Sequence, residues 1–285
     1  MDNNLCAKSQ LNAFTKGPNL MSWLKKLFVK ASGNRFIQNL LKKNVQASQA
    51  LMGIGSGSGV WSTGEQSALQ LLRQRQPPPY CVFDVGSNKG QFLQLTLESL
   101  LPGDCSIHCF EPGRETFQLL AASARKDARI KLNNIGIGRE KGEAALHYDS
   151  AGSELASLTK RKLDHFGIDF SGVETVKIDT IDNYCSENGI KRIHLLKIDI
   201  EGHELDALAG AERMFAEKAI DLVTFEFGGC NIDTRTFFQD FWRLFSRLNF
   251  AISRITPSGY LHPISAYEEI DEQFRTTNFV AVANR

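Results

Sequence analysis

Short apolar runs alternate with amphipathic stretches along residues 80–285, and this pattern predicts an alternation of strands and helices. Strands are predicted at 81–86, 106–111, 130–137, 143–149, 174–180, 193–200 and 221–228, with β-rich stretches at 249–256 and 278–283. Helices are predicted at 90–101, 114–126, 180–188, 203–217 and 236–248. Such alternation is typical of an α/β fold with a doubly wound, mostly parallel sheet.

The N-terminal extension differs from the rest of the chain in pattern and charge. Residues 1–50 hold eight Lys/Arg and one acid, Asp2, whereas the remainder carries a net charge of −6. Residues 20–45 place apolar residues and lysines at helical spacing, which predicts one or two basic amphipathic helices, and residues 1–18 are expected to be disordered. We therefore divide the chain into a basic, partly helical extension, 1–50, and one α/β domain, 51–285.

The sequence leaves two interpretations of these basic helices open. They can lie on an anionic membrane surface, or they can pack their apolar sides on the main domain or on a partner chain. Because the positive charge lies outside the folded body, we expect no nucleic-acid partner. The sequence does not indicate an oligomeric state.

Cysteine usage and the lack of long apolar runs indicate the compartment. The six cysteines form no CxxC pair and no metal-ligand spacing with histidine, which fits a reducing environment. The N-terminus has no apolar core of signal-peptide length, and no run reaches the roughly 18 apolar residues of a membrane span. We expect a cytoplasmic protein, with peripheral contact at the inner membrane surface as the alternative.

Polar residues interrupt the apolar strands at their carboxyl ends, which is where doubly wound sheets bind ligands. In the stretch VFDVGSNKGQF, Asp84 and Gly86 end the first predicted strand. The acids at the ends of later strands are Glu111, Asp199, Glu201 and Glu226. Charges within strands covered on both faces would be costly, so we expect these acids to line one cleft.

The turn after Asp84 indicates which ligand that cleft binds. Gly86 and Gly90 allow a tight turn with the backbone close to a ligand, and Glu111 suits a pair of ribose hydroxyls. A dinucleotide loop requires a glycine where Asn88 stands, and Asp84 suits a cationic or amino-bearing ligand better than a pyrophosphate. S-adenosylmethionine has a ribose, an amino-acid tail and a sulfonium but no phosphate, and we expect it as the cofactor.

Three stretches resemble the FkbM-type S-adenosylmethionine-dependent methyltransferases, namely FDVGSNKGQF, FEPGRETF and LLKIDIEGHELDALAGAERMF. The resemblance covers about residues 52–285, with NNIGIGREKGEAALHY similar to the third-strand region and ASLTKR to a mobile loop. It implies the Rossmann-like, seven-stranded sheet of class I methyltransferases, and O-methylation of a hydroxyl on a sugar, glycan or other small molecule. The cofactor-binding positions are expected at Asp84, Gly86, Ser87, Asn88, Gly90, Glu111, Pro112, Asn134, Gly136 and Asp199.

For O-methyl transfer the enzyme must position an acceptor oxygen and remove its proton. His203, just past a strand end at the start of a predicted helix, is the candidate general base, and Asp199 is the alternative. Glu201, Glu226 and Ser157 are candidates for contact with the acceptor. Asp199 and Glu201 alone would be a thin oxygen site for a divalent cation, so no metal is expected.

Other functions and other uses of the same residues stay open. The run from Lys160 to Lys162 is expected to be a solvated surface, or else to meet an anionic acceptor such as a nucleotide-sugar or a glycolipid head group. An NAD(P)-dependent oxidoreductase or epimerase uses a similar sheet, although the chain has no Y-x-x-x-K pair. A non-catalytic interaction module would bind the cofactor without turnover, and a fold alone does not decide between these functions.

Overall fold

The computed structural model describes residues 20–56, 59–100, 104–124 and 127–284. The chain divides into two compact units between Ser48 and Gln49. The segment 1–18, for which the sequence predicts disorder, lies outside the described residues.

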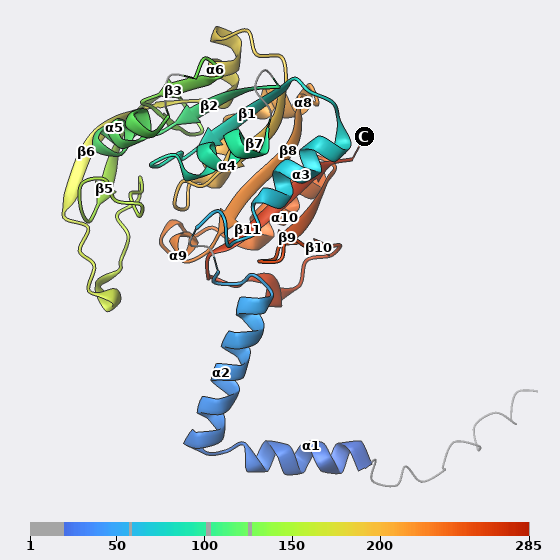
Figure 1. Ribbon diagram of the computed structural model, residues 1–285. Coiled ribbons are helices and arrows are strands. Elements are labelled where there is room, and N and C mark those ends of the chain that lie inside the picture. Colours follow the sequence, from blue (N-terminus) through green and yellow to red (C-terminus); the bar gives the residue numbers. More distant parts are fainter. Residues whose placement is uncertain (1–19, 57–58, 101–103, 125–126, 285) are drawn as a thin grey trace, which may run out of the picture. The chain divides into compact units, whose positions relative to one another are not determined.

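The basic segment of the first unit forms two helices, as its spacing predicts. They are α1 (Leu20–Ala31) and α2 (Arg35–Leu51), drawn in blue in Figure 1. The side chain of Asn34 begins α2, because its Oδ1 accepts a hydrogen bond of 3.0 Å from the backbone N–H of Ile37. No described side chain of α2 is buried. Among the described helices, none combines the length and the apolar character needed to cross a membrane.

The described strands of the second unit form an eight-stranded sheet in the order β10-β9-β11-β8-β7-β1-β2-β3 (Figure 1). The strands are β1 (Tyr80–Val85), β2 (Cys105–Phe110), β3 (Ile130–Asn133), β7 (Ile193–Ile198), β8 (Ile220–Phe227), β9 (Phe250–Ile255), β10 (Leu261–Ile264) and β11 (Thr277–Ala283). The five strands from β8 to β3 run parallel, and this confirms the predicted doubly wound α/β fold.

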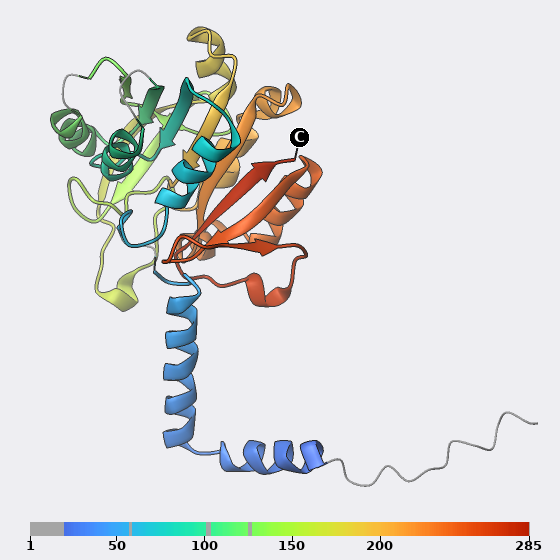
Figure 2. The ribbon, with the colours of Figure 1, turned by 45° about the vertical axis from the view of Figure 1, so that its right-hand side comes forward.

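The sheet has one strand more than the seven expected. In Figure 2 the strands drawn in orange and red lie side by side at one edge, where β11, β9 and β10 pair antiparallel. The extra strand is β10, a short segment after the turn at Gly259, and Leu261 lies opposite Ile255 of β9. Its sequence, LHPI, is too short and too mixed to be recognised as a strand from its pattern.

The prediction of a single strand at 130–137 is wrong, because the two halves of this stretch belong to different sheets. That stretch divides into β3 in the large sheet and β4 (Gly136–Ile137), which joins a three-stranded sheet in the order β4-β6-β5. The partners of β4 are β5 (Gly142–Tyr148) and β6 (Gly172–Asp179). The chain turns at Asn134, whose side-chain amide donates hydrogen bonds to the carbonyls of Glu111 and Pro112. This tertiary contact ends β3, and no local pattern indicates it.

Helices cover both faces of the large sheet. They are α3 (Gln66–Arg75), α4 (Gln91–Ser99), α5 (Arg114–Ser123), α6 (Ile181–Glu187), α7 (Glu204–Ala209), α8 (Glu212–Ala216), α9 (Cys230–Thr234) and α10 (Phe238–Arg247). The single helix predicted at 203–217 is wrong, because the chain breaks between α7 and α8 at Gly210. A Cβ atom at Gly210 would lie 2.2 Å from the carbonyl oxygen of Gly138, so the close approach of this loop requires glycine.

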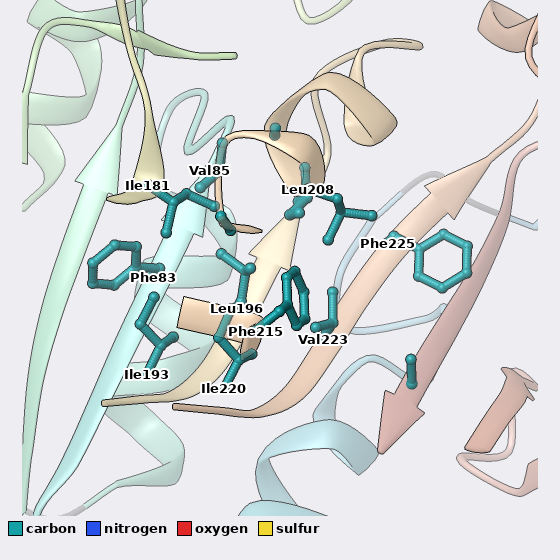
Figure 3. Close-up of a cluster of buried hydrophobic side chains, with 14 of the residues drawn as sticks. Phe83, Val85, Ile181, Ile193, Leu196, Leu208, Phe215, Ile220, Val223 and Phe225 are labelled. Atoms are coloured by element: carbon teal, nitrogen blue, oxygen red, sulfur yellow. The ribbon is translucent and has the colours of Figure 1, made fainter. Parts of the chain in front are cut away.

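The core has two halves that follow the alternation of side chains along each strand. Phe83, Leu196 and Val223 point to one face, where they pack with residues of α6, α7, α8 and α10 (Figure 3). Val82 and Leu195 point to the other face and pack with residues of α3, α4 and α5. With both faces apolar, polar side chains concentrate at the strand ends, and this positions the site.

Candidate active site

A cavity of about 760 Å³ opens at the carboxyl ends of β1, β2, β7 and β8. The chain runs from β1 outward to β2 and β3 and then returns to place β7 on the other side of β1, so the strand order reverses between β1 and β7. Open α/β sheets bind ligands in the crevice at such a switch point, and the volume lies in the range of cofactor sites.

Most of the residues that the sequence singles out line this cavity together. They are Gly86, Ser87, Asn88, Glu111, Pro112, Gly136, Ser157, Asp199, Glu201, His203 and Glu226. Three others, Asp84, Gly90 and Asn134, are not among its lining residues. Asp84 is fully buried, Gly90 begins α4 with a left-handed backbone (φ +93°), and Asn134 supports the backbone of Glu111 and Pro112.

The turn after β1 is shaped by the contact between two strand ends. Gly86 has a φ of +79°, and a Cβ atom there would lie 1.9 Å from the carbonyl oxygen of Asp199. Only glycine accommodates both the backbone angle and the contact. The glycine therefore brings the ends of β1 and β7 together at the edge of the cavity.

The carboxylate of Asp84 meets a cation of the chain itself rather than an exposed ligand site. The Nζ atom of Lys197 lies 3.3 Å from Asp84 Oδ1 and 3.5 Å from Asp199 Oδ2, and it donates a hydrogen bond of 3.2 Å to the carbonyl of Gly86. Burial disfavours the charge on Lys197, but the carboxylates of Asp84, Asp199 and Glu65 outweigh it and raise the pKa of the ammonium. The charged side chain of Lys197 thus holds the glycine turn in place through its contacts with Asp84 and the Gly86 carbonyl.

Glu111 ends β2 and presents its carboxylate to the cavity. Its two oxygens accept hydrogen bonds from the backbone N–H groups of Asn88 (3.1 Å) and Gly113 (2.9 Å). Burial raises the pKa of Glu111 to about 7, although these two N–H groups oppose the shift. Each carboxylate oxygen can accept a further hydrogen bond, so the pair can receive two vicinal hydroxyls such as those of a ribose.

The Oδ1 atom of Asn88 gives an independent indication of a ligand at this wall. It is buried and has no hydrogen-bond partner among the described residues, although Asn88 lines the cavity. Buried polar atoms are rarely left without a partner. Asn88 and Glu111 therefore fit a ligand that offers hydroxyl and amino donors, as the ribose and the amino-acid tail of S-adenosylmethionine do.

His203 lies between two polar neighbours at the start of α7. Its Nδ1 is 3.0 Å from Asp206 Oδ2, and its Nε2 is 3.0 Å from the hydroxyl of Thr159. The hydrogen bond from His203 lowers the pKa of Asp206, and a carboxylate only accepts hydrogen bonds. In the neutral imidazole, Nδ1 therefore carries the proton and Nε2 is the free base.

The loop between β5 and β6 contributes one wall of the cavity. Ser157 is buried and donates a hydrogen bond of 2.8 Å to the carbonyl of Glu201. Arg161 is not a solvated residue of a basic run, because its side chain is 9% exposed and forms an ion pair of 2.5 Å with Glu201. Its Nε atom also lies 3.7 Å from Asp233 Oδ2. The loop is thus held against the strand ends.

Four residues of the site were not among the predicted site residues, although Arg161 belongs to the basic run that the sequence leaves open for an anionic acceptor. These are Glu65, Thr159, Arg161 and Asp206. The spacing of His203 and Asp206 over one helical turn could have indicated their contact. Glu65 precedes α3 and does not follow a strand in the sequence. No local signal therefore predicts that it lines the cavity.

The fold and the site define a cofactor-binding α/β domain with an acidic cavity at its switch point. The family model described as the methyltransferase FkbM domain matches residues 84–252, and the chain belongs to this family. The family is defined by a methyltransferase domain, for which the cofactor is S-adenosylmethionine. This assignment favours the methyltransferase interpretation over a nicotinamide-dependent enzyme.

Two curated relatives match part of the chain. The 2-O-methyltransferase NoeI of Sinorhizobium fredii is 26% identical over 160 residues, which are 50% of this chain and 62% of the relative. The hexuronic acid methyltransferase AglP of Haloferax volcanii is 25% identical over 148 residues, which are 52% of this chain and 56% of the relative. The matches thus span less than two thirds of either relative.

Two solved structures of methyltransferases are similar to this chain at low sequence identity. A methyltransferase FkbM from Methylobacillus flagellatus is 17% identical, with a TM-score of 0.43 over 75% of this chain and 47% of the other. The plantazolicin methyltransferase BpumL, in complex with SAH, is 10% identical, with a TM-score of 0.44 over 93% of this chain and 99% of the other.

Proposed function

We propose that the protein is an S-adenosylmethionine-dependent O-methyltransferase that methylates a hydroxyl of a sugar, a glycan or another small molecule. The observation that carries the proposal is one cavity that contains both the Glu111 carboxylate, which can accept two ribose hydroxyls, and the imidazole of His203, whose Nε2 faces a hydroxyl and can accept a proton. A relative named for 2-O-methylation supports transfer to an oxygen, and a relative named for a hexuronic acid supports an acceptor of the sugar class.

The cofactor side of the cavity is formed by the ends of β1 and β2. Glu111 would receive the ribose hydroxyls, and Asn88 would receive the amino-acid tail through its unpartnered Oδ1. Pro112 and Gly136 line the same cavity, and we assign the adenine to them. When bound, S-adenosylmethionine supplies a methyl group already activated by its sulfonium, so this wall needs only to bind and orient.

The acceptor side is formed by the ends of β7 and β8 and by the loop at Thr159. The Thr159 hydroxyl donates to His203 Nε2 in the neutral imidazole, so this atom is positioned to accept a proton from an oxygen. An acceptor hydroxyl that takes the place of Thr159 would transfer its proton to Nε2, while Asp206 holds the ring by Nδ1. Positioned general bases contribute roughly 10²–10⁴-fold. Asp199, which faces Lys197, is the alternative base.

The test begins with calorimetric titration of the full chain with S-adenosylmethionine, S-adenosylhomocysteine and NAD. We expect both adenosyl ligands to bind and NAD not to bind. Transfer of labelled methyl groups to a panel of neutral sugars, uronic acids and nucleotide-sugars then identifies the acceptor class. Binding of NAD alone would overturn the proposal, and cofactor binding without transfer to any hydroxyl compound would favour a non-catalytic module.

For the N-terminal extension we propose peripheral contact with an anionic membrane surface, at the cytoplasmic face of the membrane. Residues 20–51 contain six Lys/Arg and no acid. On α2 the apolar side chains of Phe36, Leu40 and Leu41 are 76%, 56% and 47% exposed and fall on one side of the helix, with Lys42 on the other. An exposed apolar stripe beside a basic face matches the interface of an anionic bilayer.

Cosedimentation of the full chain with vesicles tests this contact. We expect binding to vesicles that contain phosphatidylglycerol and little binding to pure phosphatidylcholine. The double charge reversal Lys42→Glu, Lys43→Glu should abolish it, whereas Lys191→Glu, Arg243→Glu on exposed sites of the second unit should not. Equal vesicle binding by both variants would show that the N-terminal helices do not contact lipid. A dimer that depends on these helices and does not bind vesicles would show the same.

A further inference from the structure

Three carboxylates from two neighbouring strand ends converge at the acceptor side of the cavity. Asp199 and Glu201 follow β7, and Glu226 lies near the end of β8, which pairs with β7. One carboxylate oxygen of each lies within 4.8 Å of the others. The sequence offered only Asp199 and Glu201 as a pair, and the pairing of β7 with β8 adds the third acid.

Glu226 is the unusual member of this group. Its side chain lines the cavity and the residue is only 9% exposed, yet no described residue gives it a hydrogen bond or an ion pair. A buried carboxylate without a partner is strongly disfavoured. Two cations that line the same cavity are engaged elsewhere, Lys197 with Asp84 and Asp199, and Arg161 with Glu201 and Asp233. Glu226 therefore points to a ligand that brings positive charge.

We propose that Asp199, Glu201 and Glu226 bind a divalent cation of the hard class, Mg²⁺ or Mn²⁺. Carboxylate oxygens are the ligands that these ions prefer, and Mg²⁺ commonly retains several of its waters or takes substrate oxygens. The cavity leaves the open side of the three acids accessible for such ligands. Together with Asp84 and Asp233 these acids supply five negative charges against the two positive charges of Lys197 and Arg161, so a divalent cation brings the charges of the site closer to balance.

The location gives the cation a role at the acceptor, and this part of the inference rests on the proposed function. Glu201 and His203 are two residues apart and line the same cavity. A hydroxyl that coordinates a divalent cation loses its proton more readily, and two oxygens of a sugar can occupy two positions on one ion. The cation would then orient the acceptor and His203 would take the proton.

Titration of the metal-free 285-residue chain with Mn²⁺ alone, followed by electron paramagnetic resonance of the free ion, tests the site without cofactor or acceptor. We expect one saturable site. Glu226→Gln should weaken it at least about tenfold, since even the outer-shell partners of a metal contribute that much. Glu154→Gln is the matched control, because Glu154 lines the same cavity but faces Lys89.

Thermal denaturation separates a lost site from a damaged fold. Mn²⁺ should raise the Tm of wild type and of Glu154→Gln but not of Glu226→Gln. In EDTA, Glu226→Gln should be at least as stable as wild type, because it removes an unpaired buried charge. Lack of Mn²⁺ binding at millimolar concentration, or undiminished binding by Glu226→Gln, would overturn the proposal.

S-adenosylhomocysteine is titrated into the same preparations to keep the two proposals apart. If Mn²⁺ binds at Glu226 and the adenosyl ligand does not bind, the methyl-donor assignment fails while the cation site stands. If the adenosyl ligand binds and Mn²⁺ does not, the cation site fails alone. An acceptor that carries an amino group would be the remaining source of positive charge in that second case.

Discussion

The ammonium of Lys197 lies 3.3 Å from the carboxylate of Asp84, and the two residues face each other in the register of β1 and β7. Asp84 is fully buried and the Lys197 side chain is 7% exposed. Lys197 lines the cavity, and its ammonium also donates a hydrogen bond to the Gly86 carbonyl. This contact links the stability of the domain to the shape of its cofactor turn.

Lys197→Met should destabilise the domain strongly. It leaves the carboxylate of Asp84 buried without a partner, which typically costs about 3–5 kcal/mol in the free energy of unfolding. Urea denaturation measures the loss. The double variant Asp84→Asn, Lys197→Met removes the uncompensated charge and should recover part of the stability. An equal loss in the single and the double variant would show that the pair is not the reason.

Glu111→Gln should weaken the binding of S-adenosylhomocysteine by about tenfold or more, because a hydrogen bond to a charged group is worth roughly 1.5–3 kcal/mol. The amide keeps the size of the side chain but offers one acceptor instead of two. Calorimetric titration measures the affinity, and the far-ultraviolet spectrum checks the fold. Wild-type affinity in this variant would show that a residue other than Glu111 accepts the ribose hydroxyls.

The pKa of Glu111 predicts how cofactor binding depends on pH. The carboxyl has a pKa of about 7, and its ionised form is the one that accepts two ribose hydroxyls. Below pH 7 the carboxyl must first lose a proton, so affinity should fall by up to about tenfold per pH unit as pH decreases. Above pH 7 it should level off. In Glu111→Gln this part of the pH dependence should disappear.

His203→Ala should lower kcat by roughly 10²–10⁴-fold while the affinity for S-adenosylhomocysteine stays unchanged. The reason is that Nε2 is the proton acceptor, whereas Glu111 and Asn88 hold the cofactor. Asp206→Asn should lower kcat in the same direction, because Asp206 orients the imidazole through Nδ1. Single-turnover kinetics measure the chemical step. Full activity of His203→Ala would assign the base to Asp199.

Gly86→Ala should abolish cofactor binding and destabilise the domain. A methyl group there would lie 1.9 Å from the Asp199 carbonyl oxygen, and the backbone φ of +79° alone costs about 1–2 kcal/mol for an alanine. Gly142→Ala is the control, since a Cβ there meets nothing within 4 Å and stability should change by less than about 0.5 kcal/mol. The two variants are compared by thermal denaturation and by titration.

The sequence by itself determined most of the order of strands and helices, because periodicity and turn residues act over a few positions. It also determined the acids at the strand ends and the glycine turn at Gly86, since both follow from where an apolar run stops. The three stretches that resemble the FkbM family lie at these same strand ends. Eleven of the predicted site residues line one cavity for this reason.

Only the tertiary structure decided which of these residues are partners. Whether Asp84 meets a ligand or Lys197 depends on the pairing of β1 with β7, two strands more than a hundred residues apart. The position of Glu226 beside Asp199 depends in the same way on β8, and that of Arg161 on a loop folding back over the strand ends. The charge state of a buried group is set by its neighbours in space, and strand order, which no local pattern encodes, chooses those neighbours.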